Sequence, residues 1–256
     1  RSVGPALALV RAGKAFVDEA FALAYGFPNK LAEGVFKRAG YQPLGTIGRY
    51  AMPLRHAAFA TRLDEQALTR VPAAARPALV RAAHTPVVAA IAGRAVDAVQ
   101  LGRAAPAMLA GLRRLTLAAI PQPTAELDEL WAAARGDYAV VAERTRRFVG
   151  WRFLPRPERR VWTARARAGG GLRAYAVVDL IDGVAHVRDL FGHKDDVIAL
   201  IDCLPLTLYA AGASSLSMRY LGAGWLTDAL VARGLSPRAS TRMIAVTAGA
   251  ACPPAA

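Results

Sequence analysis

An internal repeat constrains the fold of this chain more than any other feature of its sequence. A gapless shift of 194 positions places Gly40 on Gly234 and Pro43 on Pro237, and it aligns residues 31–43 with residues 225–237. Around both segments the hydrophobic pattern indicates the same order of elements: helix, strand, helix, glycine, strand. Self-similarity at a fixed period marks a folding unit that recurs, so the sequence predicts two copies of one α/β unit.

The first copy lies at the beginning of the chain. Its predicted elements are a helix over residues 4–20, a buried strand over 21–27, a helix over 30–39 that ends at Gly40, and a strand over 46–54. If the repeat is real, residues 4–54 should superpose on residues 198–248.

The second copy carries additional elements ahead of the repeated ones. The dipeptide Asp182-Gly183 between two apolar runs predicts a tight β-hairpin. Helices are predicted over residues 126–134, 140–149, 194–211 and 225–233, and strands over 160–168, 172–181, 184–190, 215–220 and 240–247. The predicted fold class is therefore α/β, a mixed sheet with helices on its faces and three antiparallel strands before Lys194.

The two copies differ in length, which sets the expected domain organisation. The second copy begins near Glu126 with its extra elements, whereas the first begins at the shared half, so we expect the first domain to lack a front part of roughly 70 or more residues. The expected divisions are an incomplete first domain at 1–56, an Ala- and Arg-rich helical connector at 57–123, a second domain at 124–247 and a loose tail at 248–256. The clearest connector helices are predicted over residues 87–101 and 107–119.

The chain is strongly basic, with 33 Lys and Arg against 19 Asp and Glu and a formal net charge of +14. Two explanations stay open: a general bias toward Arg and Ala on solvated faces, and binding to a polyanion. The Arg-bearing stretch 87–119 is either a connector with a solvated face or a peripheral contact with an anionic membrane surface. No nucleic-acid-binding motif is visible, so no nucleic-acid partner is expected.

Other classes of protein lack support in the sequence. Cys203 and Cys252 are too few for a disulfide scaffold, and no C-x-x-C or H-E-x-x-H occurs, so no metal is expected. No run reaches the roughly 18 apolar residues of a membrane-spanning helix. Residues 1–5 do not read as a secretory leader, and a cytoplasmic protein is expected.

The motif that bears most directly on chemistry is RSVGPA at residues 1–6, at the start of the first predicted helix. The first turn of a helix offers unpaired amide groups and the positive end of the helix dipole, which together bind phosphate oxygens. Gly4 allows the backbone to approach closely, Ala6 keeps the contact surface small, and Arg1 can add a charge-assisted hydrogen bond.

This motif resembles the coenzyme A pyrophosphate loop of the GNAT acyltransferases, whose pattern is Q/R-x-x-G-x-G/A. Asn29, Ala32, Gly40 and Tyr41 also fit the family's spacing of Asn, Ala and Tyr-x-x-x-Gly-Phe. The resemblance implies that acetyl-coenzyme A is a co-substrate, that an amine accepts the acetyl group, and that the cofactor-binding residues are Arg1, Ser2, Val3, Gly4, Ala6 and Asn29. The second copy, with Tyr138, residues 151–153 and its hairpin, looks like the tandem GNAT-like proteins found near bacterial exopolysaccharide genes.

The sequence departs from the family pattern at the expected catalytic acid. Phe36 stands where members often have a Tyr that protonates the leaving thiolate, and phenylalanine cannot donate a proton. Tyr25 or Tyr41 could take this role, or each could be a packed aromatic.

The second copy also lacks the phosphate-binding pattern. The shift of 194 positions puts Asp195 on Arg1, Ile198 on Gly4 and Leu200 on Ala6. An acid repels phosphate and a β-branched side chain blocks the backbone, so this copy is not expected to bind pyrophosphate in this way.

Three functions follow from these features. The first is an acyl-CoA-dependent N-acyltransferase. The second is a catalytically dead GNAT-like pair that serves as a binding module in envelope or polysaccharide assembly. The third is a basic protein that binds nucleic acid or a membrane surface.

Overall fold

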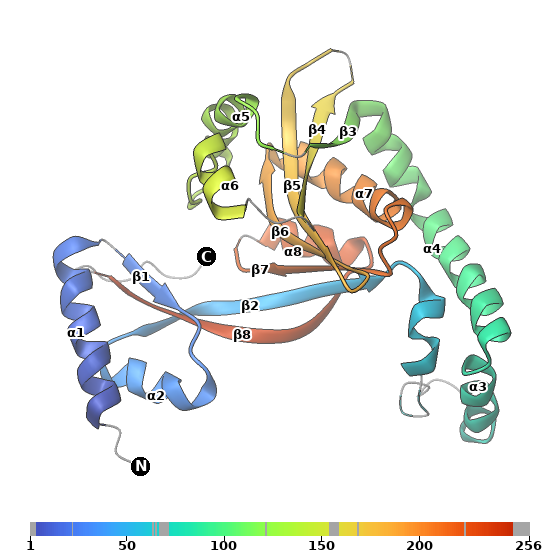
Figure 1. The fold of residues 1–256 in the computed structure, drawn as a ribbon, viewed down its shortest axis with the longest axis horizontal. Helices are drawn as coiled ribbons and strands as arrows, with labels where there is room; N and C mark the ends of the chain where they lie inside the picture. The colour runs from blue at the N-terminus through green and yellow to red at the C-terminus, as the bar shows by residue number, and fades with distance from the viewer. Residues whose placement is uncertain are drawn as a thin grey trace. The chain divides into compact units, whose positions relative to one another are not determined.

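The structure, a computed structural model, describes residues 4–21, 23–62, 64, 66, 72–120, 122–153, 159–167, 169–222 and 224–247. Its α-helices are α1 (Gly4–Ala20), α2 (Lys30–Arg38), α3 (Arg76–Ala83), α4 (Pro86–Arg114), α5 (Glu126–Ala134), α6 (Arg146–Phe153), α7 (Lys194–Ala210) and α8 (Gly224–Ala232). Its strands are β1 (Leu23–Gly26), β2 (Gln42–Pro53), β3 (Leu115–Ile120), β4 (Arg159–Ala166), β5 (Leu172–Ile181), β6 (Val184–Gly192), β7 (Ser215–Tyr220) and β8 (Ser236–Thr247). The short 3-10 helices described are η1 (His56–Arg62), η3 (Ala73–Ala75) and η4 (Arg135–Asp137). Together they make a mixed α/β fold (Figure 1).

The strands form one eight-stranded sheet in the order β1-β8-β2-β7-β6-β5-β4-β3. Strands β3 to β6 are antiparallel neighbours, and β6 pairs with β7 in parallel after the crossover helix α7. The predicted mixed sheet is present, and the three antiparallel strands predicted between residues 124 and 194 are β4, β5 and β6. Strand β3, which was not predicted, adds a fourth. By its internal contacts the chain divides into unit 1, built from described parts of residues 1–50, 219–227 and 237–256, and unit 2, built from described parts of 51–218 and 228–236.

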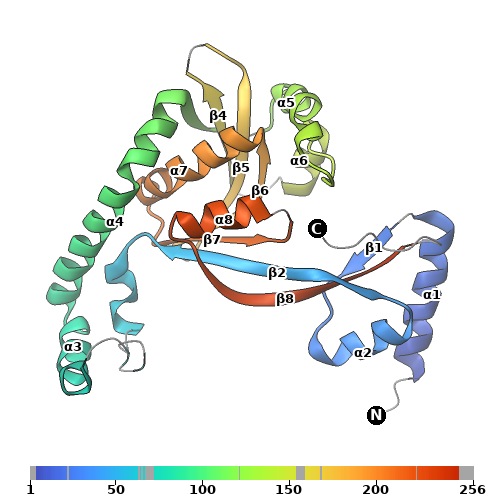
Figure 2. The same ribbon diagram turned by 180° about the vertical axis from the view of Figure 1, so that it is seen from behind.

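The main core of unit 2 lies under α5 and α6. Leu127 and Leu130 of α5 and Val149 of α6 pack against Tyr175 and Phe191 of the sheet. Helix α7 covers the other face of these strands, as Figures 1 and 2 show. Because both faces are covered, β5 is an almost continuous apolar run rather than an alternating one.

Helices α4 and α7 of unit 2 pack almost backbone to backbone. A Cβ atom added at Gly111 of α4 would lie 2.8 Å from Cys203 Sγ and 2.9 Å from the carbonyl oxygen of Ala199, so only glycine fits there without movement. Burial, with a contribution from the neighbouring Asp202 carboxylate, raises the pKa of the Cys203 thiol to about 11. The thiol is therefore protonated at neutral pH and acts as a small apolar filler of this contact.

The turn between β5 and β6 has the predicted chemistry. Asp182 and Gly183 have φ values of 49° and 74°, the left-handed pair that a type I′ hairpin requires. Ile181 and Val184 pair directly across this turn, so the hairpin sets the register of the two strands.

The repeated elements have matching bounds. Moving α2 and β2 by 194 positions gives residues 224–232 and 236–247, which are the bounds of α8 and β8. Gly40 and Gly234, which follow the two helices, have φ values of 93° and 85°, a conformation that favours glycine at a helix C-terminus. The element order that the repeat predicts is present in the structure.

Three predicted helices are wrong in extent. In place of separate helices over 87–101 and 107–119, α4 runs unbroken from Pro86 to Arg114, and residues 115–120 form β3, which pairs with β4 from Leu115↔Ala166 to Ile120↔Val161. Pairing with a distant strand outweighs the local helical pattern here. The helix predicted over 140–149 begins only at Arg146, because the Thr145 hydroxyl accepts a hydrogen bond from the N–H of Phe148 (3.2 Å) in the manner of an N-cap.

The strand predicted over 21–27 is present as β1 but is not buried. Leu23 and Tyr25 are 45% and 61% exposed. Strand β1 stands at the end of the strand order and pairs with β8 in antiparallel register, from Leu23↔Thr247 to Gly26↔Ile244. An end strand keeps one edge and part of its surface open, which explains the exposure.

The core of unit 1 joins the beginning of the chain to its last described strand. Val17 of α1 packs with Ala39 and Tyr41, which follow α2, and with Ile244 and Val246 of β8. The cluster is small, and α1 leaves Leu9 75% exposed.

Helix α4 is the longest described helix and carries exposed apolar side chains. Val87, Ile91 and Val99 are 66%, 65% and 55% exposed, beside the exposed Arg94 and Arg103. None of the helices in the described part of the chain has the length and apolar character needed to cross a membrane.

A buried ion cluster ties β4, β5 and β6 together at the core of unit 2. The Asp179 carboxylate is fully buried and accepts hydrogen bonds from Arg159 Nη2 (2.7 Å) and Arg188 Nε (2.8 Å). Arg159 also donates from Nη1 to the carbonyl oxygen of Phe153 at the end of α6 (2.6 Å). Burial by itself raises the pKa of Asp179, but the hydrogen bonds from Arg159 and then Arg188 outweigh it and leave this pKa below its usual value.

We predict that Asp179→Asn lowers the free energy of unfolding by about 3–5 kcal/mol at neutral pH, because the buried Arg159 loses its countercharge. The pKa of Asp179 is lower in the folded than in the unfolded protein. The cluster therefore stabilises the fold above the unfolded-state pKa, and this stability is lost as the pH falls through the folded-state pKa. The difference between wild type and variant should shrink below about pH 4.

Urea unfolding at neutral pH and at acidic pH measures both effects. Asp182→Asn is the matched control, because it removes an exposed carboxylate while Asn-Gly preserves the hairpin turn. Equal losses of stability in the two variants would contradict the assignment.

Candidate functional site

The predicted phosphate-binding turn lies at the beginning of α1 in unit 1. Arg1, Ser2 and Val3 lie outside the described residues, and Gly4 is the first residue of the helix. Gly4 and Ala6 are exposed, and the described first turn of α1 holds no acidic side chain. The described part of this turn therefore carries the positive end of the helix dipole without a carboxylate to repel an anion.

Asn29 has a structural task of its own. It is the N-cap of α2, and its Oδ1 atom accepts a hydrogen bond from the N–H of Ala32 (2.8 Å). One lone pair of Oδ1 is thus engaged, and Nδ2 is the donor that this side chain can offer to a phosphate oxygen. Its place among the cofactor-binding residues stays a prediction.

The two tyrosines that could donate a proton have different surroundings. Tyr41 is 8% exposed and packs edge-on against Phe36, with ring centroids 5.0 Å apart, in the core of unit 1. Tyr25 on β1 is 61% exposed and contacts Phe27, with centroids 6.0 Å apart. Of the two, only Tyr25 presents its ring to solvent.

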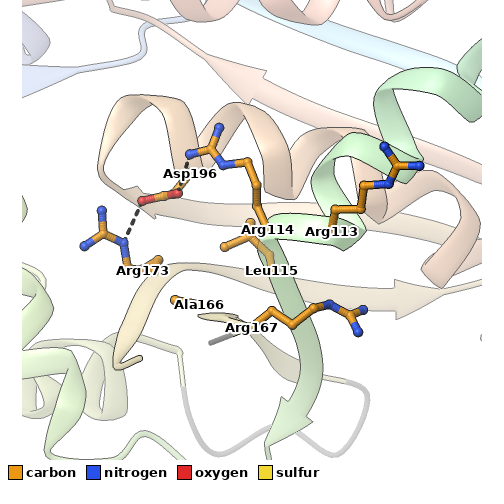
Figure 3. A pocket seen from close by; sticks show the side chains of 7 residues that line it. All are labelled: Arg113, Arg114, Leu115, Ala166, Arg167, Arg173 and Asp196. Atoms are coloured by element: carbon orange, nitrogen blue, oxygen red, sulfur yellow. Dashed lines mark hydrogen bonds and ion pairs between the residues drawn. The ribbon is translucent and has the colours of Figure 1, made fainter. Parts of the chain in front are cut away.

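The segment that the shift of 194 positions aligns with this turn begins α7 in unit 2. Its first turn carries Asp195 and Asp196, and Leu200 is fully buried. Asp196 is also buried and accepts hydrogen bonds from Arg114 Nη2 (3.0 Å) and Arg173 Nε (2.9 Å) (Figure 3). The first turn of α7 therefore carries two carboxylates, which oppose the binding of a phosphate at this helix end.

A second polar cluster in unit 2 was not predicted from the sequence. The hydroxyl of Tyr175 donates to Asp189 Oδ2 (2.7 Å), and Arg144 Nε donates to Asp189 Oδ1 (2.9 Å). The register of β5 and β6 shifts here, since Val177 pairs with Asp189 but Val178 pairs with Val187. The extra residue makes a β-bulge, which re-aims side chains.

Burial dominates the electrostatics of this cluster. It raises the pKa of Asp189, against the opposing effect of Arg144, and it raises the pKa of Tyr175 well above its usual value, reinforced by the Asp189 charge. Tyr175 is therefore a permanent hydrogen-bond donor at physiological pH. The sequence signal that could have revealed this cluster is Asp189 among the apolar residues of β6, because a buried aspartate needs hydrogen-bond partners.

Within the described residues, no three His, Cys, Asp or Glu side chains are grouped so as to hold a metal ion. The chemistry available at these sites comes from helix amides, guanidinium groups, a buried carboxylate and tyrosine hydroxyls.

Comparison with known proteins supports the fold. No protein-family model matches the chain, and no curated protein sequence matches it. Among solved structures, a GCN5-related N-acetyltransferase from Anabaena variabilis is similar with a TM-score of 0.56 at 11% identity, over 97% of this chain and 52% of that one. A conserved protein of unknown function from Enterococcus faecalis has a TM-score of 0.55 at 10% identity, over 94% and 49%.

A GCN5-related N-acetyltransferase from Sphaerobacter thermophilus is also similar, with a TM-score of 0.51 at 13% identity, over 97% of this chain and 69% of that one. At these identities the likeness shows the fold, which is that of the GCN5-related N-acetyltransferases. The chain spans about half the length of the first two proteins.

We predict that Tyr175→Phe lowers the free energy of unfolding by about 1–3 kcal/mol, because the buried Asp189 loses a hydrogen-bond donor. Urea unfolding at neutral pH measures this loss. Tyr25→Phe removes an exposed hydroxyl on β1 and should change stability by less than about 0.5 kcal/mol. A Tyr175→Phe protein as stable as the Tyr25→Phe control would show that the cluster does not stabilise unit 2.

Proposed function

We propose that this chain belongs to an acyl-CoA-dependent N-acyltransferase that transfers an acetyl group to an amine. The observation that carries the proposal is the first turn of α1, which is exposed and free of acidic side chains among its described residues. The R-x-x-G-x-A pattern ends in this turn, and the chain has the fold of GCN5-related N-acetyltransferases. Arg1, Ser2, Val3, Gly4 and Ala6 would hold the pyrophosphate of the acyl donor, with Asn29 contributing Nδ2.

The reaction makes modest demands on the protein. A neutral amine attacks the thioester carbonyl, the C–N bond forms, the C–S bond breaks and the thiolate leaves. The protein has to hold the two substrates together, stabilise the developing oxyanion, and provide for a proton that leaves the amine and one that reaches the thiolate. Tyr25 suits the last task better than Tyr41, because its ring is exposed.

We further propose that the chain carries two copies of the GNAT-like unit, the first of them incomplete, with the divisions 1–56, 57–123, 124–247 and 248–256. The matching bounds of α2 with α8 and of β2 with β8 support this. Side-chain exposure differs between residues that lie 194 positions apart. Leu9 is 75% exposed, whereas Cys203 is 1% exposed; Leu23 is 45% exposed, whereas Ser217 is 7% exposed. In a complete first copy, the counterpart of α4 would cover Leu9, as α4 covers Cys203, and the counterpart of β6 would pair beside Leu23, as β6 pairs with Ser217.

In this proposal only the first copy binds the acyl donor. In the second copy, Asp195 and the buried, doubly paired Asp196 stand in the first turn of α7, and Leu200 is part of the core. A phosphate at the amides of this helix end would meet the carboxylates of Asp195 and Asp196 in the first turn.

A second candidate function is a GNAT-like binding module without catalytic activity, acting in envelope or polysaccharide assembly. It is favoured by Phe36, which cannot donate a proton, and by the burial of Tyr41 beside it. A third candidate, a peripheral contact with an anionic membrane, is favoured by α4, whose exposed Val87, Ile91 and Val99 lie beside exposed arginines.

Calorimetric titration of acetyl-CoA into the protein encoded by the complete gene tests the proposal. Gly4→Ile should weaken binding at least about tenfold, because the side chain blocks the approach of phosphate to the helix amides. Ile198→Gly, the matched change in the second copy, should leave the affinity unchanged. A Gly4→Ile protein that binds as tightly as wild type would contradict the assignment.

Turnover separates the first two functions. Release of free thiol from acetyl-CoA in the presence of a panel of amines is expected for the transferase. Binding of acetyl-CoA without thiol release for any amine would favour the inactive binding module.

A further inference from the structure

Unit 2 contains a pocket lined by four arginines. Its volume is about 540 Å³, and its lining residues are Arg113, Arg114, Leu115, Ala166, Arg167, Arg173 and Asp196. The arginines come from the last two residues of α4, from the end of β4 and from the beginning of β5. Asp196 is the only acidic residue among these described lining residues, so their formal charge is +3.

Two of the guanidinium groups are positioned by the buried Asp196. Figure 3 shows Arg114 and Arg173 turned toward its carboxylate, which accepts from Arg114 Nη2 at 3.0 Å and from Arg173 Nε at 2.9 Å. Each of these contacts engages one N–H group of an arginine that has five. The side chains stay 55% and 44% exposed, so their other donors are accessible to a ligand.

The opposite side of the pocket is also held in place. Arg167 donates from Nε to the carbonyl oxygen of Leu112 (2.8 Å), and its backbone N–H donates to the carbonyl oxygen of Arg114 (2.9 Å). Figure 3 shows Arg113 and Arg167 extending away from Asp196, on the far side of Leu115. The C-terminal end of α4 accounts for the presence of Arg113 and Arg114. It does not account for Arg167, which directly follows β4, or for Arg173 in β5.

We infer that this pocket binds the phosphate group of a small molecule, either a phosphate monoester or a diphosphate. A ligand with a single carboxylate would leave most of the +3 charge of the pocket unbalanced. A phosphate group carries about two negative charges and several acceptor oxygens that suit the paired N–H groups of guanidinium. The volume exceeds that of one phosphate group and lies in the range of small-molecule sites. Leu115 and Ala166 supply an apolar wall for the organic part. The site is separate from the turn of α1 and does not depend on the proposed acyltransferase activity.

The test is calorimetric titration of inorganic pyrophosphate and glycerol 3-phosphate into the complete protein. Arg113→Gln/Arg114→Gln should weaken binding of both probes at least about tenfold. Arg94→Gln/Arg103→Gln removes two exposed charges from the same helix outside the pocket and should leave the affinity unchanged. Equal weakening in the two double variants, or none in either, would overturn the proposal.

Two further arms sharpen the result. Thermal unfolding verifies that the Arg113→Gln/Arg114→Gln variant is folded. If that double variant does not fold, the single variant Arg113→Gln, at an exposed position, takes its place. Acetyl-CoA should bind the wild-type protein and the pocket variant with equal affinity. If the pocket variant loses affinity for acetyl-CoA as well as for the phosphate probes, the claim of a separate site is overturned. Flotation with vesicles containing phosphatidic acid distinguishes the source of the phosphate. Retention lost in the pocket variant but kept in Arg94→Gln/Arg103→Gln assigns a lipid headgroup, whereas retention kept in the pocket variant, or no retention at all, assigns a soluble ester.

Discussion

The antiparallel pairing of β1 with β8 is the interaction on which unit 1 depends. Four residue pairs, from Leu23↔Thr247 to Gly26↔Ile244, join the first strand of the chain to the last described one. The core around Val17 and Tyr41 is completed by Ile244 and Val246 from the same strand. A helix and a short strand have little apolar area of their own to bury, so α1 and β1 need β8 to form a stable unit.

Unit 2 is organised around α7, which lies between the sheet and α4. Its apolar side chains pack on β5 and β6, Gly111 lets α4 approach its backbone, and Asp196 in its first turn fixes two arginines. The first turn of α7 therefore both packs in the core of unit 2 and holds the carboxylate that positions Arg114 and Arg173. The same carboxylate that opposes an anion at the first turn of α7 also orients the guanidinium groups of the neighbouring pocket.

Much of the fold could be predicted because its signals are local. The Asp182-Gly183 turn, the Gly40 and Gly234 helix ends and the bounds of α1 and α5 depend on residues within a few positions of each other. The strand at 115–120 could not be predicted, since its identity comes from pairing with β4 more than forty positions later.

The same distinction applies to the candidate sites. A motif such as residues 1–6 is contiguous and can be recognised, although its role stays a prediction. The arginine pocket is not contiguous: Arg114 and Asp196 are 82 positions apart, and Arg173 and Asp196 are 23 apart. Clusters of this kind come together only through the sheet and the crossover helix.

The β1–β8 pairing also has a consequence for synthesis. Domains generally fold in the order in which the ribosome releases them, but α1 and β1 leave the ribosome long before residues 236–247 exist. The antiparallel strands β3 to β6 and the helices α4 to α7 lie within residues 86–210, so they can pack together while α1 and β1 still lack their partner strand. Elements made early therefore wait for a strand made late, and during that interval the apolar side chains of α1 and β1 lack Ile244 and Val246, against which they pack in the folded unit.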